Sequence, residues 1–320
     1  MNRNWIRTRV LWTMLLLFCL IGPSTVFGAD TFPAQPVEML VAYRAGGLVD
    51  TMARALAQKM EEILSQPVVV VNKAGAGGAL ALTALKNAKN DGYTIGGTTA
   101  SSVAFTPLIQ EVSYTLQDYT YLAATARFQE AIVSVPDRPW KNFRELVEYS
   151  KKNPGLSFAS MDPIGTKVLE FIAKKEGIQW RAIPTKGGAE VMTAILGKHV
   201  DFGFSGGIHN TYCKAGKMIV LAGAGKQRLL ASPDVPTLKE FGYGSVFENN
   251  FILLMPKGAP EPVIKKLSDA IATAAKDSKY VDLLENKLEI PAAYQGGKEL
   301  EKNMQEFHET MVNLLQFLKN

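Results

Sequence analysis

Hydrophobic and polar positions follow two alternating periods along the N-terminal part of the chain. An apolar run over residues 37–43 ends at two glycines, and from Asp50 the period changes to that of a helix. One face of this helix is formed by Met52, Leu56, Met60 and Ile63. A strand, a glycine turn, a helix and another strand are then predicted over residues 68–71, 75–78, 79–88 and 93–98. This alternation predicts parallel sheet with helices on its faces.

The middle of the chain continues this alternation, and the end is more helical. Strands are predicted over residues 131–135, 157–159, 181–183, 200–204 and 218–222, and helices over residues 142–152, 166–176 and 188–196. A helix over residues 260–276 begins with prolines that suit a first turn. One face of a long terminal helix is marked by Leu300, Met304, Phe307, Met311, Leu314 and Leu318. The 320 residues exceed what one hydrophobic core usually serves, so we expect two domains joined by short crossing strands.

The first 28 residues have the features of a secretory signal peptide. Three arginines precede an apolar run over residues 10–22, and Val26 and Gly28 have the spacing of a cleavage site. The run is shorter than the roughly 20 residues that a membrane-spanning helix needs. We therefore expect an exported mature protein that begins near Ala29, and an uncleaved, membrane-tethered sensor is the alternative.

Charge and cysteine content limit the possible partners and the possible sources of stability. Without the signal peptide the chain loses three of its 35 basic residues and none of its 30 acidic ones, which leaves a net charge of +2. This balance does not favour nucleic acid as a partner. Only Cys213 remains outside the signal peptide, so the mature chain can form no internal disulfide and depends on its core for stability.

Glycine-rich loops are candidates for binding. The loop from Tyr43 to Asp50 follows the first strand, at the end of a sheet where open α/β folds bind ligands, and its glycines would let backbone amides approach a small carboxylate. The alternative is a tight turn with Asp50 as the helix N-cap. Residues 75–78 and 223–226 lack the positions that nucleotide-binding glycine motifs require.

Two short patterns offer catalysis and metal binding as alternative functions. Residues 203–207 match the G-x-S-x-G nucleophile elbow, which would make Ser205 the nucleophile of a serine hydrolase with His308 as the base and Asp234 or Asp269 as the acid. His209 and Cys213 are one helical turn apart, but two ligands do not make a metal site, and we interpret the histidines as solvent-facing loop residues. We expect no catalytic residues, no cofactor and no metal.

Short segments over the whole mature chain carry a family resemblance. These are Phe32-Pro33, residues 43–50, 67–72, 75–78, 91–94, 153–155, 158–160, Lys186-Gly187, Val200-Asp201, residues 233–237 and 256–260. In this order they resemble the periplasmic receptors of tripartite tricarboxylate transporters, often called Bug proteins. The resemblance implies an α/β, two-domain, type II periplasmic-binding-protein fold with the ligand cleft between the domains. One domain would contain residues 29–125 and 251–320, and the other residues 126–250.

The resemblance also implies a function and a set of binding residues. Such receptors capture a small carboxylate, partly through main-chain amides, and deliver it to a two-component membrane permease; we expect this one to be a monomer. The implied ligand-binding positions are Tyr43, Arg44, Ala45, Gly46, Gly47, Thr98, Thr99, Ser101, Ser102, Ser160, Gly165, Thr166, Thr185, Lys186, Gly187, Ser205 and Gly206.

Departures from the family pattern fall where specificity would be set. Met161 to Ile164 stand where the family has small and hydroxyl residues, and Ser205 replaces a common acidic residue. Because Ser205 removes a partner for an ammonium group, while Arg44 could pair with a second carboxylate, we expect amino acids to bind worse than simple or dicarboxylic acids.

Overall fold

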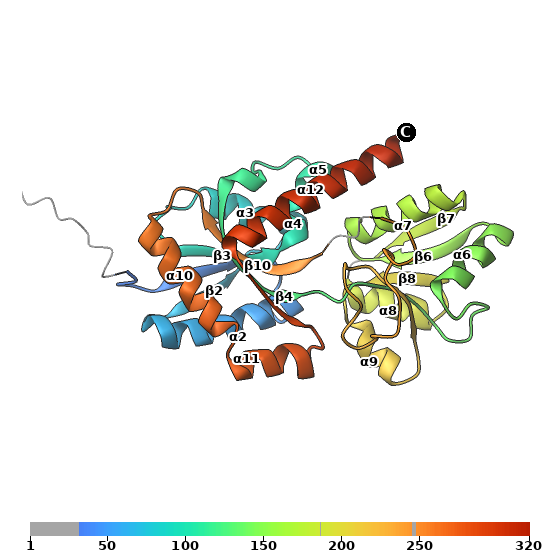
Figure 1. Ribbon diagram of the computed structural model, residues 1–320, viewed down its shortest axis with the longest axis horizontal. Coiled ribbons are helices and arrows are strands. Elements are labelled where there is room, and N and C mark those ends of the chain that lie inside the picture. Colours follow the sequence, from blue (N-terminus) through green and yellow to red (C-terminus); the bar gives the residue numbers. More distant parts are fainter. Residues whose placement is uncertain (1–31, 186, 245–247) are drawn as a thin grey trace, which may run out of the picture.

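The chain folds into two α/β units in a computed structural model that describes residues 32–185, 187–244 and 248–320 (Figure 1). The first unit is built on a six-stranded sheet in the order β11-β4-β10-β3-β1-β2. The second is built on a five-stranded sheet in the order β7-β6-β8-β5-β9. In both sheets parallel strands are combined with antiparallel ones, because the chain passes from one unit to the other and back.

Elements of the first unit come from both ends of the chain. Its strands are β1 (Val37–Val41), β2 (Val68–Asn72), β3 (Thr94–Thr99), β4 (Tyr119–Arg127), β10 (Asn250–Pro256) and β11 (Ala292–Gly296). Its helices are α2 (Leu48–Leu64), α3 (Ala79–Lys86), α4 (Ala100–Ala104), α5 (Thr106–Ile109), α10 (Glu261–Ala274), α11 (Ser278–Asp282) and α12 (Gly297–Lys319). Short 3-10 helices lie at η2 (Ala76–Gly78) and η3 (Leu116–Asp118), and one π-helical turn lies at η4 (Leu283–Lys287).

The second unit is continuous in sequence. Its strands are β5 (Ala131–Ser134), β6 (Leu156–Ser160), β7 (Trp180–Pro184), β8 (Phe202–Ser205) and β9 (Ile219–Gly223). Its helices are α6 (Phe143–Lys152), α7 (Pro163–Glu176), α8 (Gly188–Leu196) and α9 (His209–Lys214). The strands and helices predicted from periodicity are therefore confirmed with small shifts at their ends, whereas periodicity did not indicate β4, β10, β11, α4, α5, α9 or α11.

Helix α2 illustrates how the local pattern produces the fold. Met52, Leu56 and Met60 have no exposed surface, as the predicted apolar face requires. The helix begins at Leu48 with Gly47 as its N-cap, so the alternative interpretation of Asp50 as N-cap is wrong. Asp50 instead lies in the first turn, where its buried carboxylate accepts a hydrogen bond from the Gly46 amide at 2.8 Å.

Two crossing segments connect the units. The chain leaves the first sheet at the end of β4, passes through residues 128–130 and enters β5; it returns through Glu248 and Asn249 into β10. The segments are hydrogen-bonded to each other, because the Phe128 amide donates to the Asn249 carbonyl at 2.9 Å. Arg127 and Glu248 add an ion pair at 3.5 Å. The predicted domain limits fall within β4 and at the start of β10.

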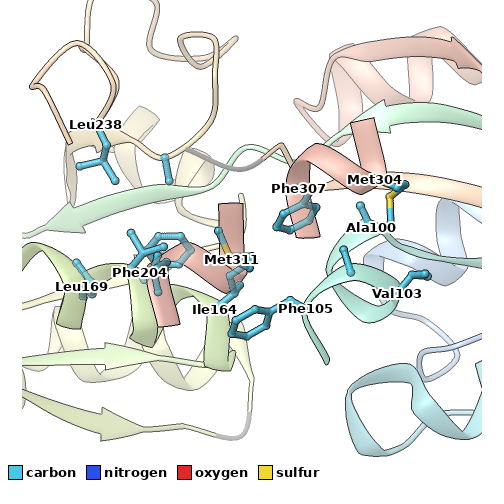
Figure 2. Close-up of a cluster of buried hydrophobic side chains, with 14 of the residues drawn as sticks. Ala100, Val103, Phe105, Ile164, Leu169, Phe204, Leu238, Met304, Phe307 and Met311 are labelled. Carbon is cyan, nitrogen blue, oxygen red and sulfur yellow. The ribbon is translucent and has the colours of Figure 1, made fainter. Parts of the chain in front are cut away.

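Helix α12 extends from the first unit onto the second. Figure 2 shows Met304 and Phe307 beside Ala100 and Val103 of α4, and Met311 on the side of Ile164 and Phe204. All of these side chains belong to one buried cluster that is shared by the two units.

The last turns of α12 continue this contact with α7. The Phe317 ring packs edge-on against Phe171 at 5.0 Å, and Lys174 donates to the carbonyl of Leu318 at 3.2 Å. The helix is thus an apolar connection between the units in addition to the crossing segments.

Replacement of Met311 by alanine should destabilise the protein. The Met311 side chain is fully buried, so Met311→Ala removes apolar contacts and leaves a cavity, at a cost of about 2–5 kcal/mol in the free energy of unfolding. Urea denaturation measures this. Phe317→Ala is the matched control, because Phe317 is 39% exposed and should lose less. Equal losses in the two variants would contradict the assigned role of the buried part of α12.

Candidate functional site

The ends of strands from both sheets lie at the junction between the units. In the first sheet Thr99 at the end of β3 pairs with Phe251 near the start of β10, and β10 pairs with the end of β4 at Arg127. In the second sheet Ser205 at the end of β8 pairs with Ala131 at the start of β5. The crossing segments connect the two sheets at these strand ends. The loops that follow β1, β3, β6, β7 and β8 therefore lie at the junction between the units. Most of the residues predicted to bind ligand lie on these loops.

Hydroxyl groups form a connected cluster on the first unit. The Tyr43 hydroxyl lies 2.8 Å from Thr99 Oγ1 and 2.9 Å from Ser102 Oγ. Thr99 Oγ1 also accepts from the Ser102 amide as the N-cap of α4, and lies 2.9 Å from Ser101 Oγ. The structure thus brings four predicted residues together. Thr98, the predicted residue beside them, is buried, and its hydroxyl has no hydrogen-bond partner within the described residues.

The glycine loop between β1 and α2 is exposed, but some of its amides are occupied. The Gly46 amide donates to Asp50 and the Gly47 amide donates to the Arg44 carbonyl at 3.3 Å. Gly46 has a φ of +77°, a conformation that favours glycine, whereas Gly47 is extended with a φ of −82°. No side chain caps α2, so its first-turn amides rather than those of the two glycines are the donors available to an anion.

Asn249 connects the hinge to this hydroxyl cluster. Its Nδ2 donates to Glu130 Oε1 at 3.0 Å, and its Oδ1 accepts from the Ser101 amide at 3.0 Å. Glu130 is 6% exposed, and no ion pair joins it to a cation in the described part of the chain. Burial, and then the negative charge of Asp162, raises the pKa of the Glu130 carboxyl to about 8.

The loop after β6 carries the predicted positions Ser160, Gly165 and Thr166. The Asp162 carboxylate caps α7 by accepting from the Gly165 amide at 2.6 Å, and the carbonyl of Asp162 accepts from the hydroxyls of Ser160 and Thr166. A Cβ on Gly165 would lie 2.4 Å from the Phe204 ring. Gly165 is therefore needed for the packing of α7 on β8, and its amide is not free for a ligand.

The loop after β7 is anchored to the end of β6. Thr185 donates from its amide and from its hydroxyl to the Ser160 carbonyl, at 3.2 and 3.1 Å. Gly187 is the N-cap of α8. The predicted residue Lys186 lies outside the described residues.

Ser205 is paired with a histidine, but with a different one from that of the hydrolase hypothesis. Its Oγ lies 3.0 Å from Nδ1 of His209, while His308 lies on α12 and contacts the Ala104 carbonyl at 2.8 Å. Burial lowers the pKa of His209 to about 4, and its Nε2 has no hydrogen-bond partner within the described residues. The pair thus lacks the carboxylate that orients the base of a catalytic triad.

His209 also corrects the interpretation of the histidines as solvent-facing loop residues. It is fully buried and begins α9, one turn before the partly buried Cys213. Residues 32–185, 187–244 and 248–320 contain no group of three or more His, Cys, Asp or Glu side chains that could hold a metal ion. In the same residues no helix is long and apolar enough to cross a membrane.

A cavity of about 280 Å³ lies beside α12 rather than at the glycine loop. It is lined by Ala100, Lys226, Lys239, Gly244, Glu248, Asn250, Leu300, Asn303, Met304, Glu306, Phe307 and Thr310. None of the predicted binding residues is among them. We assign the candidate site to the junction loops, because the hydroxyl cluster and the hinge acid meet there.

Glu130, Asn249 and Asp162 are the site residues that sequence reasoning missed. Burial raises the pKa of the Tyr43 hydroxyl, and the charges of Asp162 and Glu130 act in the same direction, so both acids lie near it. Ser205 replaces the acidic residue common in the family, but Asp162 and Glu130 are two other acids at this junction, and the weaker binding of amino acids stays a prediction. Arg44, the proposed partner for a second carboxylate, is exposed and makes no ion pair within the described residues.

Comparisons with known proteins agree on one family. The model described as "Tripartite tricarboxylate transporter family receptor" matches residues 52–318. The "UPF0065 protein in gbd 5'region" of Cupriavidus necator is 36% identical over 260 residues, covering 80% of this chain and 79% of that protein. A TctC solute-binding protein from Polaromonas has 26% identity and a TM-score of 0.79, covering 89% of this chain and 99% of that one. The periplasmic binding protein BugD has 27% identity and a TM-score of 0.72, and the match covers 90% of this chain and 99% of BugD.

Glu130 should make the stability of the protein depend on pH. Its pKa is raised from 4.5 to about 8 in the folded protein. The stability that Glu130 contributes is therefore fully present below the pKa of the unfolded chain, and it is lost as the pH rises to the pKa of the folded protein. Glu130→Gln keeps an acceptor for Asn249 but has no proton to lose. From about pH 5 to about pH 8.5 the wild type should lose on the order of 3 kcal/mol of unfolding free energy relative to the variant. Urea denaturation at the two pH values measures this, and parallel pH profiles would contradict it.

Proposed function

Because the chain belongs to the tripartite tricarboxylate transporter receptor family, we propose that the junction loops are where this periplasmic receptor captures its small carboxylate. Receptors of this family bind solutes and are not enzymes, so Ser205 is assigned no role as a hydrolase nucleophile. The proposed binding residues are those of the loops after β1, β3, β6, β7 and β8, with Gly165 retained only as a packing residue.

One observation supports this assignment most strongly. The Tyr43 hydroxyl, Thr99, Ser101 and Ser102 form one hydrogen-bonded cluster beside the uncapped start of α2. Hydroxyl groups and first-turn amides both donate hydrogen bonds to carboxylate oxygens, and the positive end of the helix dipole favours the negative charge. The first unit therefore carries a set of donors that suits a carboxylate.

The second unit and the hinge complete the proposed site. Ser160, Thr185 and Ser205 stand at the facing edge, and Asn249 connects the hinge to Ser101. We place the division between the domains near residues 125/126 and 250/251, so that a rotation about the crossing segments would close one unit on the other.

Export and delivery are part of the same proposal. Cleavage near Gly28/Ala29, which lies outside the described residues, would release a periplasmic receptor. It would act as a monomer and deliver the carboxylate to a two-component membrane permease. A thermal-shift screen of carboxylates identifies the ligand, since a ligand at a hundred times its dissociation constant stabilises by about 2.7 kcal/mol.

Gly47→Val should abolish binding of the best carboxylate from that screen. A Cβ at position 47 already approaches the Arg44 carbonyl to 3.3 Å, and the two methyl groups of valine would add bulk at the start of α2, over the free amides. Losing two charge-assisted hydrogen bonds costs at least about 3 kcal/mol, or about a hundredfold in affinity. Titration calorimetry measures the change.

Gly47→Ala is the control for this variant. Because Gly47 is extended and not in the left-handed region, alanine needs no unusual backbone conformation there, and the variant should stay folded with a smaller loss of affinity. Near-native affinity in a folded Gly47→Val protein would show that the loop is only a turn.

A further inference from the structure

Two large apolar side chains are exposed at the edge of the second unit that faces the hydroxyl cluster. Met161, directly after β6, is 45% exposed, and Ile208, just before α9, is 43% exposed. A folded protein gains free energy by burying such side chains, so neighbouring exposed apolar residues at a binding site commonly mark a surface that a ligand covers.

Met161 and Ile208 lie next to each other, although they are 47 positions apart in the sequence. A Cβ built on Gly188 would lie 3.0 Å from Ile208 Cδ1 and 3.4 Å from Met161 Sδ, so both side chains converge over the start of α8. A Cβ on Gly206 would lie 3.9 Å from Met161 Cε. The two side chains thus form one apolar surface between the loops after β6 and β8 and the start of α8.

This surface belongs to the junction rather than to an outer face. Met161 precedes Asp162, whose charge acts on the Tyr43 hydroxyl of the first unit. Ile208 follows the loop in which a Cβ on Gly207 would contact Gln129 of the crossing segment at 3.8 Å. Because Met161 and Ile208 contact each other over Gly188, the surface that they form lies near this crossing segment.

We propose that Met161 and Ile208 bind the apolar body of the ligand, and that they make the receptor selective for carboxylates with an aliphatic or aromatic body over compact polar acids. The inference rests on the proposed function and specifies its substrate class. Small-molecule sites are mostly apolar, with a few polar groups that fix orientation. Here the hydroxyl cluster and the α2 amides hold the carboxylate, and the Met161–Ile208 surface contacts the rest of the molecule.

The test is a calorimetric titration of a graded series of acids. Acetate, butanoate and hexanoate lengthen the apolar body without a change of charge, benzoate adds a ring, and succinate provides a polar acid of similar size to butanoate. Affinity of the wild type should rise about fourfold for each added methylene group and should be higher for butanoate than for succinate. Met161→Gln and Ile208→Thr should each lower the affinity for hexanoate about tenfold and leave that for acetate unchanged.

Val69→Thr is the matched control for Ile208→Thr. Val69 is 49% exposed on β2 and lies outside the junction loops, so the same kind of change there should leave all affinities unchanged. Circular dichroism establishes that each variant is folded.

The outcomes distinguish failure of the Met161–Ile208 role from failure of the proposed carboxylate site. Wild-type affinity that does not increase with chain length, or variants that weaken acetate and hexanoate equally, would overturn the role of Met161 and Ile208 while leaving the carboxylate receptor intact. Binding of none of the acids, in this series or in the carboxylate screen, would overturn the proposed site and this inference with it.

Discussion

The Asn249 side chain joins the parts of the protein that must act together. Its Oδ1 accepts a hydrogen bond from the Ser101 amide in the first unit, and its Nδ2 donates one to Glu130 on the opposite crossing segment. The main-chain carbonyl of Asn249 accepts from the Phe128 amide. Ser101 is itself part of the hydroxyl cluster around Tyr43, through its contact with Thr99. A change in the angle between the crossing segments therefore acts on the same groups that hold the proposed ligand, which is what coupling of binding to closure requires.

This arrangement buries the acid Glu130, which pairs with no cation in the part of the chain that the structure describes. Burial of the Glu130 carboxyl disfavours its charged form, and the hydrogen bond from Asn249 only partly offsets that cost. The α12 contacts and the apolar cluster shared by the two units stabilise the surroundings of the hinge. Stability in this region thus comes from packing, and the polar groups that surround Glu130 add little to it.

Much of the fold was predictable because its elements carry regular patterns. The apolar face of α2, the β-branched run of β2 and the stripe of α12 each determine an element locally. Strands β4 and β10 have no polar–apolar alternation, because they lie in the middle of the first sheet and are buried on both faces. For these strands only the family resemblance indicated where the chain crosses between the units.

The site was predictable in position more than in chemistry. Glycines and hydroxyls after strands pointed to the loops that the structure places at the junction between the units, since the carboxyl ends of parallel strands meet on one side of a sheet. The pairing of Glu130 with Asn249 joins positions 119 residues apart, and the burial of His209 depends on packing, so no local pattern could reveal either. Likewise, the glycine pattern did not indicate that the Gly46 amide donates to Asp50 and the Gly47 amide to the Arg44 carbonyl, so that both glycine amides are occupied.

Small-angle scattering of the mature receptor, with and without a saturating carboxylate, tests the central claim most directly. If the ligand is held between units that rotate about the crossing segments, the radius of gyration should decrease on binding, and the Gly47→Val protein should show a smaller decrease at the same ligand concentration. Identical scattering profiles for the free and the saturated wild type would contradict enclosure of the ligand between the two units.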